Sequence, residues 1–187
     1  EMIWLKYRSP SGYNEDWQVY HKGLNGGSNL GHYSIRLDSS SSQYGPSAND
    51  WNNTAPTSTH FTIGSDGRNN RNNSSYIVNL FASVEGISKV GYYTGSNGSA
   101  SPGQVAQTIT TGFSPRFVII KEASPNGGSW LVLDTTRGWG AGNDKNLYMD
   151  LPDAQSNFNF GAPTATGFTL TYDELGFYNS NGDKYIY

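Results

Sequence analysis

An internal repeat of domain length constrains the fold of this chain more than any other feature of the sequence. Residues 1–6 and 17–20 return as residues 116–121 and 130–133, and residues 56–63 and 76–77 return as residues 163–170 and 185–186. The matched segments lie 107 to 115 positions apart. Solenoid and propeller repeats run to roughly 20–50 residues, whereas a small β-sandwich needs about 100. The repeat unit is therefore expected to be a whole domain.

The repeat also predicts the domain boundary. We expect a first unit over residues 1–87 and a second over residues 88–187. The first copy starts abruptly at Glu1, and the second stops at Tyr187 while the first continues beyond the matching position. We interpret the chain as a window cut from a longer tandem protein, with the first unit incomplete at its start and the second cut at its last strand.

Composition excludes several classes of function. A net charge of −3 gives no basic surface for phosphate backbones, so nucleic acid is not an expected partner. The chain has no Cys, which rules out thiolate zinc sites, disulfide scaffolds and cysteine nucleophiles. No apolar run reaches the roughly 20 residues that cross a bilayer, so membrane insertion is not expected. The aromatic share of 14% suffices to build a core.

Short β-rich segments separated by polar turns run along the whole chain, and no stretch keeps a 3.6-residue apolar period. The linkers between them contain Gly-Ser-Asn-Gly, Pro-Asn-Gly-Gly and Asn-Ser-Asn-Gly, which supply the positive-φ positions that tight turns require. We therefore predict an all-β fold, an antiparallel β-sandwich of the jelly-roll or concanavalin A-like kind, in two tandem pseudo-repeats. The strands predicted for the second unit are residues 89–94, 104–110, 117–121, 130–134, 146–150, 168–172 and 184–187.

Two of the strand-like segments differ from the rest in hydrophobic pattern. In an ordinary half-buried strand apolar residues alternate with polar ones, as Trp17 and Val19 do. Residues 2–5 and 117–120 are instead apolar at four consecutive positions. We expect these two segments at the centre of a sandwich or at the contact between the units.

Catalytic patterns are weak in this sequence. No G-x-S-x-G turn with a following helix is present, which argues against a serine hydrolase. A glycosidase needs only two carboxyl groups about 5 to 9.5 Å apart across a groove. The carboxylates considered for that role are Asp134, Asp150, Asp173 and Glu174. The three histidines, His21, His32 and His60, all lie in the first copy, and we interpret them as structural or surface residues.

No cofactor is expected, and calcium is the one metal with candidate ligands. Residues 66–70 and 179–183 are oxygen-rich loops at equivalent places in the two copies. Neither follows the EF-hand spacing, and Asp-Gly and Asn-Gly are also ordinary turn sequences. We interpret both loops as turns and keep calcium as the alternative.

Exposed aromatic side chains are the type of site that the composition favours. Tyr and Trp give a large contact area at low entropic cost, and Ser, Gly and Asn give adaptable hydrogen bonds. Taken singly, each aromatic residue is also expected as a structural side chain that packs over the open edge of a β-sandwich. The candidate ligand-binding residues are Trp51, Trp139, Tyr44, Tyr92, Tyr93 and Tyr178.

Four phrases carry a resemblance to a known family. They are WNNTAPTSTHFTIG at residues 51–64, VEGISKVGYYTG at 84–95, TGFSPRFVIIK at 111–121 and GDKYIY at 182–187. The chain resembles the tandem concanavalin A-like or laminin-G-like β domains of marine bacteriophage and cyanophage virion proteins. The resemblance implies a location in the virion, in tail fibres, tail spikes or related appendages. It supplies no catalytic motif.

The resulting hypothesis is a non-enzymatic structural domain of a phage tail fibre or spike. Its expected partners are other virion chains and a bacterial surface polysaccharide, and a homo-oligomer is expected. The alternatives are a capsid decoration or assembly protein, a depolymerase that degrades capsule or lipopolysaccharide, and a bacterial cell-surface adhesin. Fold analogy alone does not decide among them.

Overall fold

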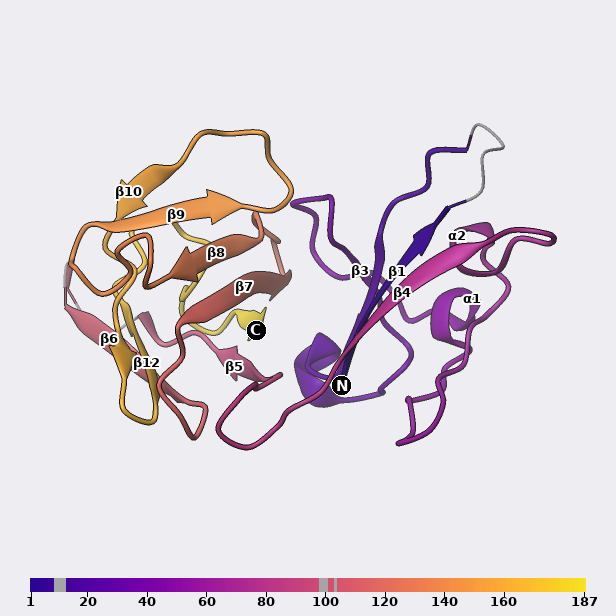
Figure 1. Cartoon of the computed structure of the whole chain (residues 1–187), viewed down its shortest axis with the longest axis horizontal. Coiled ribbons are helices and arrows are strands. Elements are labelled where there is room, and N and C mark those ends of the chain that lie inside the picture. Colours follow the sequence, from indigo (N-terminus) through magenta and orange to yellow (C-terminus); the bar gives the residue numbers. More distant parts are fainter. Residues whose placement is uncertain (9–12, 98–100, 103) are drawn as a thin grey trace.

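The computed structural model describes residues 1–8, 13–97, 101–102 and 104–187, and its regular structure is mostly antiparallel β (Figure 1). This confirms the predicted all-β class. The helical turns are η1 (Leu24–Gly27), α1 (Ala48–Trp51) and α2 (Gly67–Asn70). The strands are β1 (Met2–Tyr7), β2 (Gln18–His21), β3 (Ile35–Arg36), β4 (Tyr76–Phe81), β5 (Tyr92–Thr94), β6 (Val105–Thr110), β7 (Phe117–Ser124), β8 (Leu131–Asp134), β9 (Asp144–Tyr148), β10 (Ser156–Phe158), β11 (Pro163–Thr164), β12 (Gly167–Thr171) and β13 (Lys184–Ile186).

The described residues of the first half form one four-stranded sheet in the order β3-β2-β1-β4. In β1, Trp4 pairs with Val19 of β2 on one side and with Asn79 of β4 on the other. Alternate residues of β1 point to opposite faces. Ile3 and Leu5 therefore share one face, where they pack against Tyr20 and Trp51 in a buried cluster.

The second half contains two sheets, in the orders β10-β9-β8-β7-β13-β5 and β11-β12-β6. Strand β7 lies between β8 and β13, and β12 lies between β11 and β6. One buried cluster joins the two sheets, because Ile120 of the larger sheet and Phe168 of the smaller one are both fully buried members of it. The core of this half therefore lies between the sheets.

Each strand predicted between residues 89 and 187 overlaps an observed strand, but two strands were missed. β10 has three residues, of which only Phe158 is apolar, and it lies at a sheet edge. β11 has two residues and begins with Pro163, so neither strand has an alternating hydrophobic pattern. β9 also begins two residues earlier than predicted. The buried carboxylate of Asp144 accepts hydrogen bonds from the backbone N–H groups of Gly140 (2.8 Å) and Phe160 (2.9 Å), which fixes that strand end.

The matched segments 56–63 and 163–170 do not form the same regular structure. Phe168 and Leu170 lie in β12, which pairs with β6. Phe61 and Ile63 are in no strand and pack as half-buried side chains against the first-half cluster. The described residues of the first half place no strand beside them.

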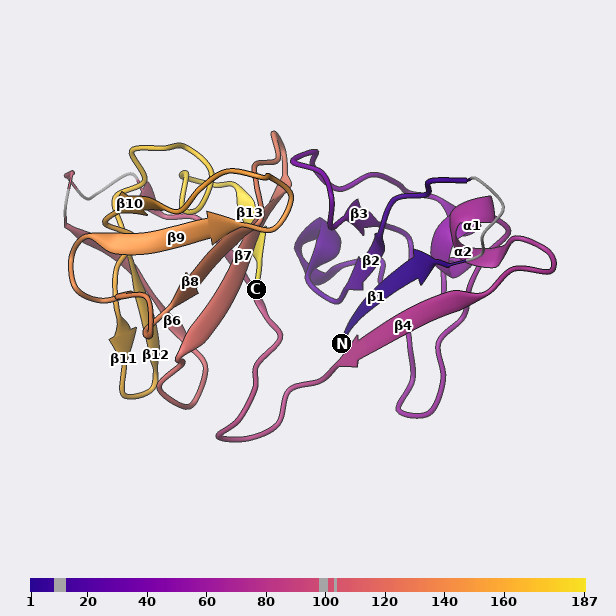
Figure 2. The same ribbon diagram turned by 45° about the horizontal axis from the view of Figure 1, so that its top comes forward.

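The two halves meet along a shared buried cluster. Val19 and Ile35 of the first half pack there with Ala123, Trp130 and Ile186 of the second. Met2 and Trp4 of β1 and Ile119 of β7 pack against the same cluster. The two four-residue apolar segments thus lie in central strands and also contribute to the contact between the halves. Both chain termini lie at this junction (Figures 1 and 2).

Hydrogen bonds also cross the junction. The indole Nε1–H of Trp130 donates to the carbonyl oxygen of Arg36 at 2.8 Å. The buried Lys121 ammonium donates to the carbonyl oxygens of Ser40 (2.9 Å) and Gly128. Burial lowers the pKa of Lys121 to about 8, because removal from water disfavours the charged form. The halves are therefore joined by directional bonds as well as by apolar contact.

Candidate functional site

The six aromatic residues singled out in the sequence fall in different places. Trp51, Trp139, Tyr93 and Tyr178 are buried. The indole of Trp51 donates to the hydroxyl oxygen of Ser34 at 2.7 Å inside the first half. The other three lie in the core of the second half. These four rings are packing elements and are not open to a ligand from solvent.

Tyr92 and Tyr44 are the two candidates that reach the surface. Tyr92 is 48% exposed, and its ring lies over Gly23 and Gly27 of the first half. Tyr44 is half-buried and lies between two arginines, with the guanidinium carbons of Arg36 and Arg68 at 5.4 and 5.7 Å from its ring centre. The structure brings Tyr44 and Trp51 into the same region, and it leaves the other four candidates elsewhere.

The carboxylates considered for catalysis hold turns and strand ends. Asp134 accepts from the backbone N–H of Arg137 and pairs with its guanidinium at 2.7 Å. Asp150 accepts from the backbone N–H of Trp130 at 2.9 Å. The buried Asp173 accepts from four backbone N–H groups in residues 175–179. Glu174 is exposed.

The candidate calcium loops have other hydrogen-bonding roles. Asp66 caps α2 by accepting from the backbone N–H of Arg68 at 2.8 Å, and its two oxygens also accept from that guanidinium at 2.9 and 2.7 Å. The buried Asn179 side chain donates to the carbonyl oxygen of Thr171. Among the residues that the structure describes, no group of three or more His, Asp or Glu side chains is placed to hold a metal ion.

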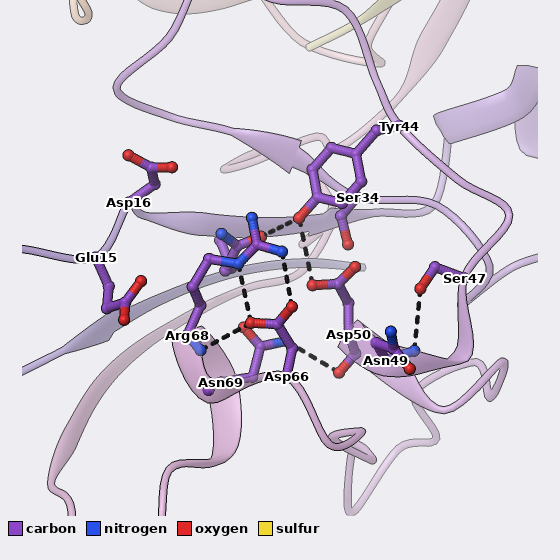
Figure 3. A network of polar contacts seen from close by, with 12 residues as sticks. Glu15, Asp16, Ser34, Tyr44, Ser47, Asn49, Asp50, Asp66, Arg68 and Asn69 are labelled. Carbon is purple, nitrogen blue, oxygen red and sulfur yellow. Dashed lines mark hydrogen bonds and ion pairs between the residues drawn. The ribbon is translucent and has the colours of Figure 1, made fainter.

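A surface of the first half gathers arginines, tyrosines and carboxylates in alternation, and we call it the arginine–tyrosine surface. Figure 3 shows the part of it around Tyr44, Asp50 and Arg68. The surface extends from Tyr13 across the sheet to α2. Four of the five cation–π contacts found among the described residues lie on it. The fifth, Lys6 over Trp17, lies on the opposite face of the sheet, because Lys6 and Tyr7 are successive residues of β1. The members of the surface are Tyr7, Tyr13, Glu15, Asp16, Arg36, Tyr44, Asp50, Asp66, Arg68 and Arg71.

Short local structures position one side of this surface. Ser47 caps α1 by accepting from the backbone N–H of Asn49 at 3.1 Å, and Asn52 ends α1 in the left-handed conformation that Asn tolerates. α1 thereby places Asp50 beneath Tyr44. The side-chain amide of Asn69, in α2, donates to the carbonyl oxygen of Asp50 at 2.9 Å, which fixes the two short helices to each other.

Asp50 is the buried carboxylate of the surface. It is 2% exposed and accepts a hydrogen bond from the Tyr44 hydroxyl at 3.2 Å. Burial raises the pKa of Asp50 above its usual value, and the positive charge of Arg68 opposes that shift. Burial also raises the pKa of Tyr44 to about 12, with the nearby Asp50 carboxylate as a further cause. The bond to Arg68 lowers the pKa of Asp66 instead, so the two neighbouring carboxylates differ in environment.

The other end of the surface is more open. Tyr13 is 55% exposed, and the guanidinium carbon of Arg71 lies 3.9 Å from its ring centre. Arg71 also pairs with Glu15 at 2.5 Å. On the next residue, Asp16 pairs with Arg36 at 3.2 Å. Two ion pairs, held by the consecutive residues Glu15 and Asp16, therefore lie between the exposed ring of Tyr13 and Tyr44.

Charge on this surface is balanced by pairing. The three arginines each contact one carboxylate. A ligand would therefore meet donors and acceptors side by side next to the faces of aromatic rings, with no excess of positive charge. Asp50 is covered by Tyr44, so its carboxyl group is not placed to reach a substrate.

Sequence reasoning missed the arginines. Tyr44 was predicted as a candidate because it is an aromatic residue in a loop. Arg36, Arg68 and Arg71 belong to no sequence motif, and they lie in different segments of the chain. The available signal was the Asp66-Gly67-Arg68 turn, since an Asp that caps a helical turn leaves its second oxygen for a nearby cation.

A separate apolar groove of about 740 Å³ lies where the two halves meet. Its walls include Trp4, Leu80 and Phe81 from the first half and Phe113 and Phe117 from the second. Ile87, in the segment that links the halves, also lines it. Leu80, Ile87 and Phe117 are 65%, 76% and 56% exposed. This groove differs from the arginine–tyrosine surface in having few polar groups.

Comparison with known proteins gives one match. The family described as Domain of unknown function (DUF7483) matches residues 1–187. No curated protein and no solved structure matches the chain significantly. Among the described residues no helix is long and apolar enough to cross a membrane.

Proposed function

This chain belongs to the DUF7483 family, and we propose that it is a non-enzymatic glycan-binding unit of a phage virion appendage, a tail fibre or spike. The observation that carries the proposal is the alternation of rings and ion pairs on the arginine–tyrosine surface. Tyrosines give rigid, amphipathic contact area, and neighbouring charged pairs supply both donors and acceptors. Its location in the virion rests on the resemblance to phage virion domains.

The balanced charge favours a neutral, hydroxyl-rich glycan. A sugar hydroxyl both donates and accepts, so it can bridge a carboxylate and a guanidinium of one ion pair. Glu15 and Arg71, beside the exposed ring of Tyr13, offer this arrangement. An acidic glycan would have to compete with carboxylates that already hold the arginines. Weak single contacts would be multiplied by the number of copies on the particle.

We also propose that the two halves are versions of one sandwich unit, as the sequence repeat suggests. The N–H of Trp17 donates to Asp38 (3.1 Å), and the N–H of Trp130 donates to Asp150 (2.9 Å). The hydroxyls of Tyr76 and Tyr185 each accept from a backbone N–H five residues earlier, at 2.7 and 2.9 Å. The central strands also have corresponding neighbours: β1 lies between β2 and β4, and β7 lies between β8 and β13.

The experiment is retention of the multivalently tethered protein on a panel of neutral and acidic bacterial surface polysaccharides, with calcium and with chelator. We expect selective retention on neutral glycans that does not depend on calcium. Tyr13→Ala and Arg71→Met should each weaken retention roughly three- to thirtyfold, which corresponds to the loss of one cation–π platform. Arg137→Met is the matched control, because Arg137 pairs with Asp134 without a ring contact.

Three results would reject the proposal. They are retention on no glycan, equal loss with the Arg137 control, and release of free sugar, which would show a depolymerase. The apolar groove favours a second candidate, a capsid decoration or assembly protein. An exposed apolar patch of this kind is typical of a protein contact. Binding to other virion chains with no glycan retention would support that candidate.

A further inference from the structure

We propose that the free edge of β4 binds an extended peptide strand of another protein chain, one that carries a tyrosine at the position that Tyr93 has in β5. This inference rests on the correspondence between the two halves that is proposed above. It concerns a different surface from the glycan site, and it names a protein partner.

β4 is an edge strand with few of the features that normally block pairing. It pairs with β1 over six consecutive residues without a bulge. Among the described residues, nothing pairs with its other side. The strand contains no charged residue and no Pro, and Leu80 and Ile77 are 65% and 45% exposed. Long apolar edges of this kind are templates for an added strand.

The second half shows what covers the corresponding edge. There β13 takes the place of β4, and β5 pairs antiparallel with its outer side. Tyr93 of β5 pairs with Tyr185 of β13, and the two rings stack with centres 4.9 Å apart and planes 13° apart. Tyr76 aligns with Tyr185 in the sequence repeat. It therefore offers the same ring position to an incoming tyrosine.

The correspondence also identifies the backbone groups available on β4. Tyr187 follows β13, and its N–H and C=O both bond to Gly91, which precedes β5, at 2.9 Å. Val78 is the aligned residue of β4, lying two positions after Tyr76 as Tyr187 lies two after Tyr185. Its N–H and C=O are thus expected to point away from β1, toward the added strand. The neighbouring Leu80 would be covered on binding.

The probe is a synthetic peptide with the sequence of residues 89–96, titrated into the isotope-labelled protein and followed by NMR. We expect amide shifts concentrated in β4, with β10, another sheet edge, unaffected. A Tyr93→Ala peptide should bind about tenfold more weakly, because it lacks the stacking ring. Val78→Pro in the protein should abolish binding, because it removes the outward N–H while β1 keeps its partners.

Leu80→Lys is the second variant, and it is informative even if Val78→Pro does not fold. Val105→Lys is its matched control, because Val105 is 59% exposed on the edge strand β6. We expect Leu80→Lys to weaken peptide binding and Val105→Lys to leave it unchanged. No binding at millimolar peptide overturns the proposal, as does equal binding by folded Val78→Pro. Self-association of the protein through β4 would also overturn it, since the occupant would then be β4 itself.

The peptide titration contains no glycan, so the two proposals can fail separately. Loss of peptide binding with glycan retention intact rejects the edge site alone. Peptide binding without glycan retention rejects the glycan function alone.

Discussion

The imidazole of His21 is joined to the carbonyl oxygen of Tyr187 across the contact between the two halves, with Nε2 and the oxygen 3.2 Å apart. Nδ1 of the same ring accepts from the backbone N–H of Gly23 at 2.9 Å. Since Nδ1 accepts, the proton of the neutral ring is on Nε2, and His21 donates to Tyr187. One side chain of β2 thus holds the end of the second half.

This arrangement predicts an acid-sensitive junction. Burial lowers the pKa of His21 from 6.5 to about 4. The unfolded chain therefore takes up a proton at a higher pH than the folded one, and stability falls as the pH falls from 6.5 toward 4. The loss should be on the order of 3 kcal/mol. His21→Gln keeps a donor without a titratable ring, so its stability should depend less on pH in urea unfolding between pH 7 and pH 4. An unchanged pH dependence would contradict this assignment.

The indole bond at the junction predicts a difference between two buried tryptophans. Trp130→Phe loses the bond from Nε1 to Arg36 and leaves that carbonyl oxygen unpaired. Trp139→Phe loses no such bond, because the buried Nε1 of Trp139 has no partner. Replacing Trp130 should cost about 1–3 kcal/mol more than replacing Trp139. Chemical unfolding of both variants measures the difference, and equal costs would show that the bond contributes nothing.

The strands were predictable because most of them carry local signals. β7 and β8 have apolar runs that end at Gly or Pro turns, and the repeat itself located β1 and β2. β10 and β11 had no such signal, since edge pairing with β9 and β12 defines them. The residues around Phe61 also gave no sign that this segment would not form a strand. The matching Phe168 is extended because β6 pairs beside it.

The candidate site was less predictable than the fold. Composition identified aromatic residues as a class, but burial of Trp51 or Tyr178 depends on contacts with residues distant in the sequence. Tyr44 gains its position from Arg36 and Arg68, which approach it only after β3 and α2 have packed. Pairwise charge contacts between distant segments leave no periodic pattern in a single sequence.

Close approach of two strands predicts a strict requirement for glycine at position 167. Gly167 of β12 pairs with Thr110 of β6, and a Cβ atom there would lie 1.9 Å from the carbonyl oxygen of Ile109. Gly167→Ala should therefore force the strands apart and cost roughly 1–3 kcal/mol or more. The neighbouring exposed residue gives the control, since Thr166→Ala should change stability by less than about 0.5 kcal/mol. Urea unfolding measures both variants, and a neutral Gly167→Ala would contradict the observed strand spacing.

The buried pair of Tyr44 and Asp50 predicts a stability change that depends on pH. The Tyr44 hydroxyl donates to Asp50, whose pKa is raised mainly by burial. A raised carboxyl pKa favours the folded state at low pH, and that contribution is lost as the pH rises from the unfolded pKa through the folded one. Tyr44→Phe removes a donor to the charged carboxylate and raises this pKa further. Its cost should therefore be about 1–3 kcal/mol at pH 7 and smaller at pH 4.

The matched background for this measurement is Asp50→Asn, which has the same shape and no titratable group. In that background, the cost of Tyr44→Phe should be the same at pH 7 and pH 4, because no carboxylate remains to be stabilised. A double-mutant cycle at the two pH values isolates the coupling between the hydroxyl and the carboxylate. If the cost of Tyr44→Phe is independent of pH with Asp50 present, then the hydroxyl acts through Gln18, its other partner, and Asp50 does not contribute.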